Sequence, residues 1–129
     1  MRVAVLRACG QNWNPEIFLR EHKLVTAAVW QETEGNAGRR RADSGFNVTI
    51  ADAASSSELV SKTIRWVQEN RAVLAALTTT NVKAQVDIGV TVGSSEQFSA
   101  SVLLTQNDLL ALSQSGVELS FSAYPASDG

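Results

Sequence analysis

The chain of 129 residues contains 44% hydrophobic and 19% charged residues, a composition that excludes an intrinsically disordered protein. Its formal net charge of −2 lacks the basic excess of most nucleic-acid-binding proteins, so a nucleic-acid partner is not expected. No apolar run is long enough to cross a membrane, and the length fits a single domain over residues 1–129.

The N-terminal third predicts a strand, a helix and a loop. Residues 2–8 alternate weakly and are rich in valine and alanine, which favours a strand. Asn14 followed by Pro15 is typical of a helix start. Residues 25–30 allow either a short edge strand or an extended connection. Residues 32–45 contain three glycines and almost no apolar residue, so we expect an exposed loop there.

The centre of the chain gives the clearest patterns. Residues 46–50 alternate between apolar and polar side chains and predict a strand. Ser55 to Glu58 resembles a capping box, and the apolar residues after it recur at helical spacing, so one long helix is expected to begin there. Residues 84–92 alternate again and predict the next strand.

The C-terminal part predicts a short helix and a last strand, with a possible short strand before them. Residues 98–102 allow a short strand or an extended arm. Thr105 with an acidic residue three positions on predicts the start of a short helix, and Gly116 is placed where a helix often ends. Residues 117–123 alternate as a last strand, and residues 125–129 are expected to be a flexible tail.

These elements predict an α+β fold. We expect a mostly antiparallel sheet of four to five strands, with two or three helices packed on one face. The other face should carry the polar residues of the alternating strands. These are Asn47, Thr49, Gln85, Asp87, Thr91, Glu118, Ser120 and Ser122.

The order of elements resembles the bacterial family known as domain of unknown function 4279. The resemblance rests on Cys9-Gly10 after the first strand, the Asn14-Pro15-Glu16 helix start, and the segment of residues 24–30 with its leucine and tryptophan. It continues through the glycine-containing basic loop, the long helix and the last strand, which closes on Tyr124. Val25 and Thr26 stand where the family has a proline. The resemblance implies a small domain with helices and a sheet, and no activity.

No catalytic, metal or cofactor site is predicted. His22 is the only histidine, and it is expected near a helix C-terminus. Cys9 is the only cysteine, so no internal disulfide is expected and a small apolar role is favoured. One histidine and one cysteine do not make a zinc site. The lone cysteine and the absence of a signal-peptide pattern indicate a cytoplasmic protein.

Six residues are candidates for a binding surface. Arg39, Arg40 and Arg41 form a basic run that suits an acidic partner or a phosphate. Trp30 precedes the loop that contains them, and an exposed tryptophan beside arginines is typical of an interface anchor. The two carboxylates Asp87 and Glu118 are expected on one face of the sheet, where a partner-facing role is favoured over acid–base chemistry.

Three hypotheses follow. The first is a non-enzymatic domain that binds another protein, for example an immunity protein that neutralises a bacterial toxin. The second is a small enzyme or ligand-binding domain with a cleft between the sheet and the loop over residues 32–45. The third is a structural module that self-associates, as a homo-oligomer, through an edge strand at residues 25–30 or 98–102.

Overall fold

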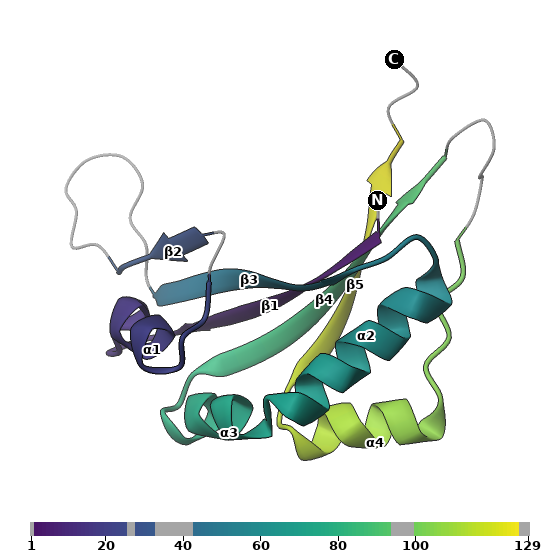
Figure 1. Ribbon diagram of the computed structural model, residues 1–129. Helices are drawn as coiled ribbons and strands as arrows, with labels where there is room; N and C mark the ends of the chain where they lie inside the picture. Colours follow the sequence, from purple (N-terminus) through teal and green to yellow (C-terminus); the bar gives the residue numbers. More distant parts are fainter. Residues whose placement is uncertain (1, 26–27, 33–42, 94–99, 127–129) are drawn as a thin grey trace.

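A five-stranded sheet with four helices on one of its faces forms the described part of the computed structural model, which comprises residues 2–25, 28–32, 43–93 and 100–126 (Figure 1). The strands are β1 (Arg2–Gly10), β2 (Ala28–Trp30), β3 (Ser44–Asp52), β4 (Lys83–Val92) and β5 (Glu118–Pro125). The helices are α1 (Pro15–Glu21), α2 (Ser56–Glu69), α3 (Arg71–Thr79) and α4 (Gln106–Gln114). The predicted α+β class is confirmed, with more helices than expected.

The strands lie in the order β2-β3-β1-β4-β5, so the first strand of the chain is in the middle of the sheet. β1 pairs antiparallel with both β3 and β4, and β2 pairs antiparallel with β3. β4 and β5 run parallel. A parallel neighbour needs a crossover connection, which the segment containing α4 supplies. The predicted mostly antiparallel sheet is therefore confirmed, with one parallel pair at its edge.

The core lies between the sheet and the helices. Every second residue of β1 is buried on the helix side (Ala4, Leu6 and Ala8), because side chains alternate between the two faces of a strand. The other strands and the helices contribute further buried apolar side chains. The largest of them are Phe46, Leu59, Val67, Leu74, Leu77, Val86 and Ile88. The described helices all lie on this one side of the sheet (Figure 1).

The helix predicted from Ser55 onward is broken into α2 and α3 at Asn70. Asn70 donates both its backbone N–H and its side-chain Nδ2 to the carbonyl oxygen of Trp66, each over 2.9 Å. Its φ of −111° and ψ of 30° depart from helical values. Asparagine competes in this way for backbone hydrogen bonds, whereas the apolar stripe runs on unbroken. The prediction of one long helix was therefore wrong.

The predicted capping residues are confirmed at three helix starts. The Asn14 side chain accepts hydrogen bonds from two backbone N–H groups in the first turn of α1. Thr105 and Asp108 form a reciprocal capping box at α4. Ser55 Oγ accepts a hydrogen bond from the Glu58 N–H over 3.2 Å at α2. These bonds satisfy backbone groups that have no partner inside the helix.

Several predicted boundaries differ from the observed ones. The last two residues of the loop predicted over residues 32–45 belong to β3, because Ser44 and Gly45 pair with the end of β1. Residues 33–42 lie outside the described residues. A strand or extended arm was predicted over residues 98–102, and its described residues, 100–102, form no strand. Among the described residues of the edge strand that residues 25–30 allowed, only Ala28–Trp30 form a strand, β2. None of the described helices has the length and apolar character of a membrane-crossing segment.

Candidate binding surface

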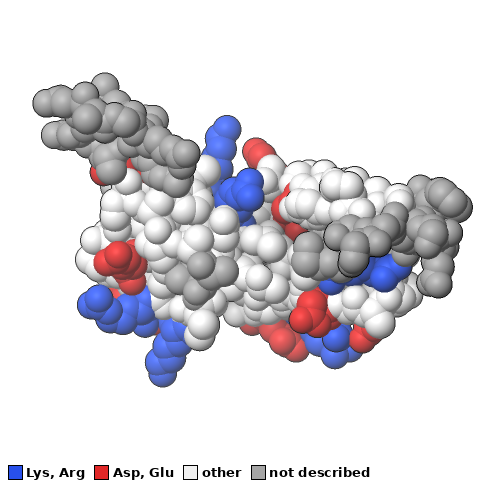
Figure 2. Space-filling model, turned by 90° about the horizontal axis from the view of Figure 1, so that it is seen from above, with Lys and Arg blue, Asp and Glu red and all other residues white. Residues whose placement is uncertain are grey.

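The sheet face opposite the helices is here called the open face, and Figure 2 looks down on it. Because successive side chains of a strand point to opposite faces, the residues of the open face alternate along each strand with the buried residues of the core. They are Val3, Val5, Arg7, Cys9, Ala28, Trp30, Gly45, Asn47, Thr49, Lys83, Gln85, Asp87, Gly89, Thr91, Glu118, Ser120, Ser122 and Tyr124. Figure 2 shows cationic and anionic side chains scattered over a mostly uncharged surface. The predicted polar face is confirmed.

Asp87 lies in a small hydrogen-bond cluster on the open face. Its Oδ1 accepts a hydrogen bond from Ser120 Oγ over 2.6 Å and another from Ser122 Oγ over 2.8 Å. The parallel register produces this arrangement, since Asp87 lies opposite Ser120, and Ser122 is the next residue of β5 on the same face. Hydrogen bonds to a charged carboxylate are stronger than those between neutral groups. Asp87 is therefore held in a fixed position.

Glu118 lies on the open face with Asp87, but in a different environment. It lies at the start of β5, opposite Gln85, and is exposed. Paired carboxylates catalyse proton transfer when they lie close together in environments that shift their pKa values. Here the one carboxylate is held by two serines and the other faces solvent. The two carboxylates therefore lie in different environments.

An aromatic ring covers a glycine near each edge of the open face. Trp30 lies against Gly45, where an added Cβ atom would be 2.5 Å from its Cζ2. Tyr124 lies over Gly89, where an added Cβ atom would be 2.9 Å from its Cε2. The Trp30 indole N–H also donates to Asp43 Oδ1 over 3.0 Å, which fixes the orientation of the ring. Both rings remain partly accessible to solvent.

The surroundings of Cys9 favour its protonated thiol form. Burial raises its pKa, and the neighbouring Asp43 carboxylate raises it further through its charge and a hydrogen bond. Arg7 and Lys83 act in the opposite direction, with smaller effects. A thiol with a raised pKa stays protonated at neutral pH and reacts slowly. His22 lies elsewhere, at the C-terminus of α1, with its ring centroid 4.2 Å from that of Phe18.

Two shallow hollows lie at the end of the open face where β1 ends and β3 begins. One has a volume of about 360 Å³ and is lined by Arg7, Ala28, Trp30 and Asn47. The other has a volume of about 350 Å³ and is lined by Cys9, Gly10, Gln11, Asp43, Asn81 and Lys83. Arg7 Nε donates to Asn47 Oδ1 over 3.2 Å at the first hollow. Cationic and hydrogen-bonding groups therefore gather at this end.

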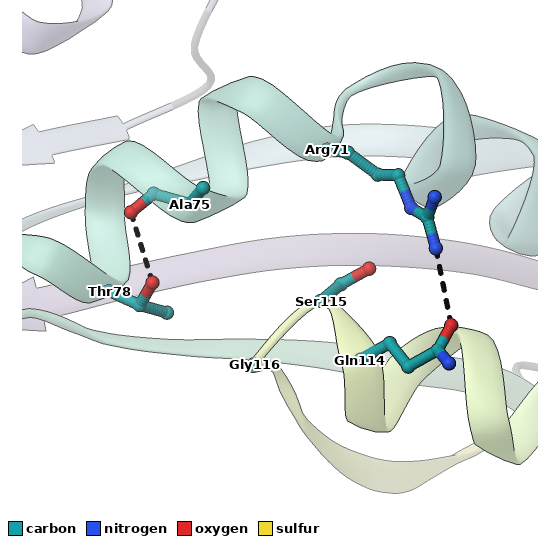
Figure 3. A pocket seen from close by; sticks show the side chains of 6 residues that line it. All are labelled: Arg71, Ala75, Thr78, Gln114, Ser115 and Gly116. Atoms are coloured by element: carbon teal, nitrogen blue, oxygen red, sulfur yellow. Dashed lines mark hydrogen bonds between the residues drawn. The ribbon is translucent and has the colours of Figure 1, made fainter.

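A third hollow, of about 330 Å³, lies between α3 and the C-terminal end of α4, away from the open face (Figure 3). Arg71 Nη2 donates across it to Gln114 Oε1 over 3.2 Å. Thr78 and Ser115 donate their hydroxyl protons to carbonyl oxygens of their own helices. Because these side chains bond to one another or to the backbone, the hollow is a junction between two helices.

The structure brings only some of the predicted site residues together. Asp87 and Glu118 lie on adjacent strands of one face, as predicted. Trp30 lies near the opposite edge of the sheet. Arg39, Arg40 and Arg41 are outside the described residues. Asp87, Ser120 and Ser122 were predicted on one face, but the hydrogen bonds between them were not, because they depend on the register of β5 with β4.

The described residues contain no group of three or more histidine, cysteine, aspartate or glutamate side chains that could hold a metal ion. No protein-family model, curated protein or solved structure matches the chain. The resemblance to domain of unknown function 4279 therefore stays a prediction.

Proposed function

We propose that this chain is a non-enzymatic protein-binding domain that contacts its partner with the open face. One observation carries the proposal: the described helices cover a single face of the sheet, while half-buried Val3 and Val5 lie among polar side chains on the other. Protein interfaces combine an apolar centre with a polar rim in this way. The fixed carboxylate of Asp87 adds a directional acceptor for a donor on the partner.

The partner's chemistry follows from the charges near the two hollows. Arg7 and Lys83 are exposed there. The run Arg39, Arg40 and Arg41 belongs to the segment that joins β2 to β3. Cations attract carboxylates over the distances at which two proteins first meet, which raises the rate of association. We therefore expect an acidic protein surface to bind this end, with the Trp30 ring as an anchor.

Neutralisation of a bacterial toxin, the role of an immunity protein, is the form of this proposal to test first. It needs a stable recognition surface and no chemistry. A cytoplasmic location belongs to the same proposal. It is supported by Cys9, which is free and the chain's only cysteine, because proteins of reducing compartments carry few disulfides.

The test is a pull-down from lysate of the source organism with three forms of the tagged protein. The second form carries Arg7→Glu and Lys83→Glu. The third carries Arg20→Glu and Arg65→Glu, which make the same charge change at exposed positions on the helix layer. The proposal expects the native form and the helix-layer variant to retain one protein in stoichiometric amount and the open-face variant to lose it. Equal retention by both variants would remove the open face from the interaction.

The loop arginines need a separate variant, because they lie outside the described residues. Replacing Arg39, Arg40 and Arg41 together by alanine should weaken binding of the same partner if the run contacts it. Each exposed ion pair contributes about 0.5 kcal/mol, so the loss of three should lower the affinity by roughly tenfold. Isothermal titration with the purified partner measures this change, and an unchanged affinity would exclude the run from the interface.

A second candidate function is binding of a small polar ligand. It is favoured by the hollow that both the acidic residue Asp43 and the exposed, basic residue Lys83 line. A thermal-shift screen of small charged metabolites tests it. A ligand of this hollow should raise the melting temperature of the native protein and leave that of a Lys83→Ala variant unchanged. Equal shifts in both proteins would place the ligand elsewhere.

A further inference from the structure

The last strand, β5, forms an edge of the sheet that no other described strand pairs with. The sheet order places β4 on one side of β5 and no described strand on the other (Figure 1). The other edge strand, β2, is much shorter, with 3 residues against 8. In a parallel pair, backbone groups of alternate residues point away from the neighbour. The β5 edge therefore presents a row of hydrogen-bonding groups.

β5 lacks the devices that usually protect an edge strand. Natural edges carry lysines, central prolines, bulges or inward-pointing charges, which oppose pairing with another chain. The only charged residue of β5 is Glu118 at its start, and its only proline is Pro125 at its end. The register with β4 runs without a shift from Glu118 to Pro125. The strand between these ends is regular and open to pairing.

Most of the exposed large apolar side chains belong to the last part of the chain, which includes β5. Of the seven large hydrophobic side chains exposed among the described residues, five belong to β5, α4 or the segment before α4. They are Leu103, Leu109, Leu110, Phe121 and Tyr124. Phe121, which is 55% exposed, borders a shallow hollow of about 350 Å³ with Val90, Ala100, Val102 and Ala123. A partner that covers Phe121 and this hollow would remove apolar surface from water.

The side chains of β5 are complementary to a second copy of the same strand. An antiparallel pair centred on Phe121 places Ser120 opposite the partner subunit's Ser122 and Leu119 opposite the partner subunit's Ala123. A large apolar side chain then meets a small one. The charge of Glu118 falls opposite the partner subunit's Tyr124, so no like charges meet. Pro125 falls beyond the other pairs, where its missing N–H matters least.

We propose that two copies of the chain associate through β5 around a two-fold axis at Phe121. The two five-stranded sheets then join into one continuous sheet. The Phe121 ring of each copy covers the apolar hollow beside its partner's strand, which removes exposed apolar surface from water. Pairing at the edge leaves the open face uncovered, so this dimer and the proposed binding of another protein are independent of each other.

The first test is the molar mass of the full chain in solution, measured by light scattering over a wide range of concentrations. The native protein should form a dimer as concentration rises. Phe121→Lys should weaken the dimer by about tenfold or more, because the two lysines meet across the axis. Ile17→Lys is the matched control, since Ile17 is a similarly exposed apolar residue on α1. Circular dichroism verifies that both variants fold.

The second test gives a positive signal for the proposed register. In a Cys9→Ser background, Phe121→Cys places two thiols opposite each other across the axis, within the distance that a disulfide spans. Mild oxidation should therefore cross-link Phe121→Cys and not Ile17→Cys. A monomer at every concentration would overturn the proposal. So would a dimer that neither Phe121→Lys weakens nor Phe121→Cys cross-links, or a β5 edge that pairs only with a strand of another protein.

Discussion

Ser44 shows how much one buried polar residue organises at the start of β3. It is completely buried, and its Oγ accepts a hydrogen bond from the Glu32 N–H over 2.8 Å. Its carbonyl oxygen accepts another from Trp13 Nε1 over 2.7 Å. A buried polar group left without such bonds would cost about 1–3 kcal/mol. Ser44 thus ties together three segments that are far apart in the sequence.

The raised pKa of Cys9 provides a prediction at the level of one residue. Asp43→Asn removes a negative charge beside the thiol, so the thiolate becomes easier to form and the pKa of Cys9 falls. The amide oxygen can still accept the Trp30 N–H, so the local structure should persist. The measurement is the rate of alkylation by iodoacetamide against pH. Its midpoint should move to lower pH than in the native protein.

Asp52→Asn is the control for this experiment, since it makes the same change at the other end of β3, on an exposed residue. Its alkylation profile should match that of the native protein. A profile of Asp43→Asn that also matches would show that Asp43 has no influence on the thiol.

Among the secondary-structure elements, α4 connects the parallel pair and depends on its N-terminal cap. Thr105 Oγ1 accepts the Asp108 N–H over 3.1 Å, and the Asp108 carboxylate accepts the Thr105 N–H over 2.9 Å. Thr105→Ala removes one of these bonds and should lower the free energy of unfolding by about 0.5–2 kcal/mol. Ser113→Ala, at an exposed position of the same helix, should change it by less than about 0.5 kcal/mol. Urea denaturation measures both, and equal effects would contradict the role of the cap.

The elements also show what the sequence could and could not predict. The caps at Asn14 and Thr105 and the alternation along β4 are local signals, which follow from neighbouring residues alone. The break at Asn70 was missed because the apolar stripe continues on both sides of it. The strand order was not predictable, since it depends on which distant surfaces pack together. For the same reason, the hydrogen bonds around Asp87 needed the parallel register of β5.

On the scale of the whole molecule, the core lies on only one face of the sheet. Substitutions at neighbouring residues of β1 test this directly. Leu6 points into the core and is completely buried, whereas Val5 lies on the open face and is half-buried. Leu6→Ala should therefore lower the free energy of unfolding by about 2–5 kcal/mol. Val5→Ala should lower it by only about 1 kcal/mol. Equal losses in chemical denaturation would mean that both faces of the sheet are covered.

The parallel pairing of β4 with β5 has a consequence for synthesis. When residues 2–92 have left the ribosome, β1 to β4 and α1 to α3 can assemble, but one edge of β4 is still without a neighbour. That strand carries Ala84, Val86, Ile88 and Val90 on one side, and unpaired apolar strands are prone to aggregate. Docking of α4 and β5 ends this period. The nascent chain therefore depends on its last two elements to shield a strand made well before them.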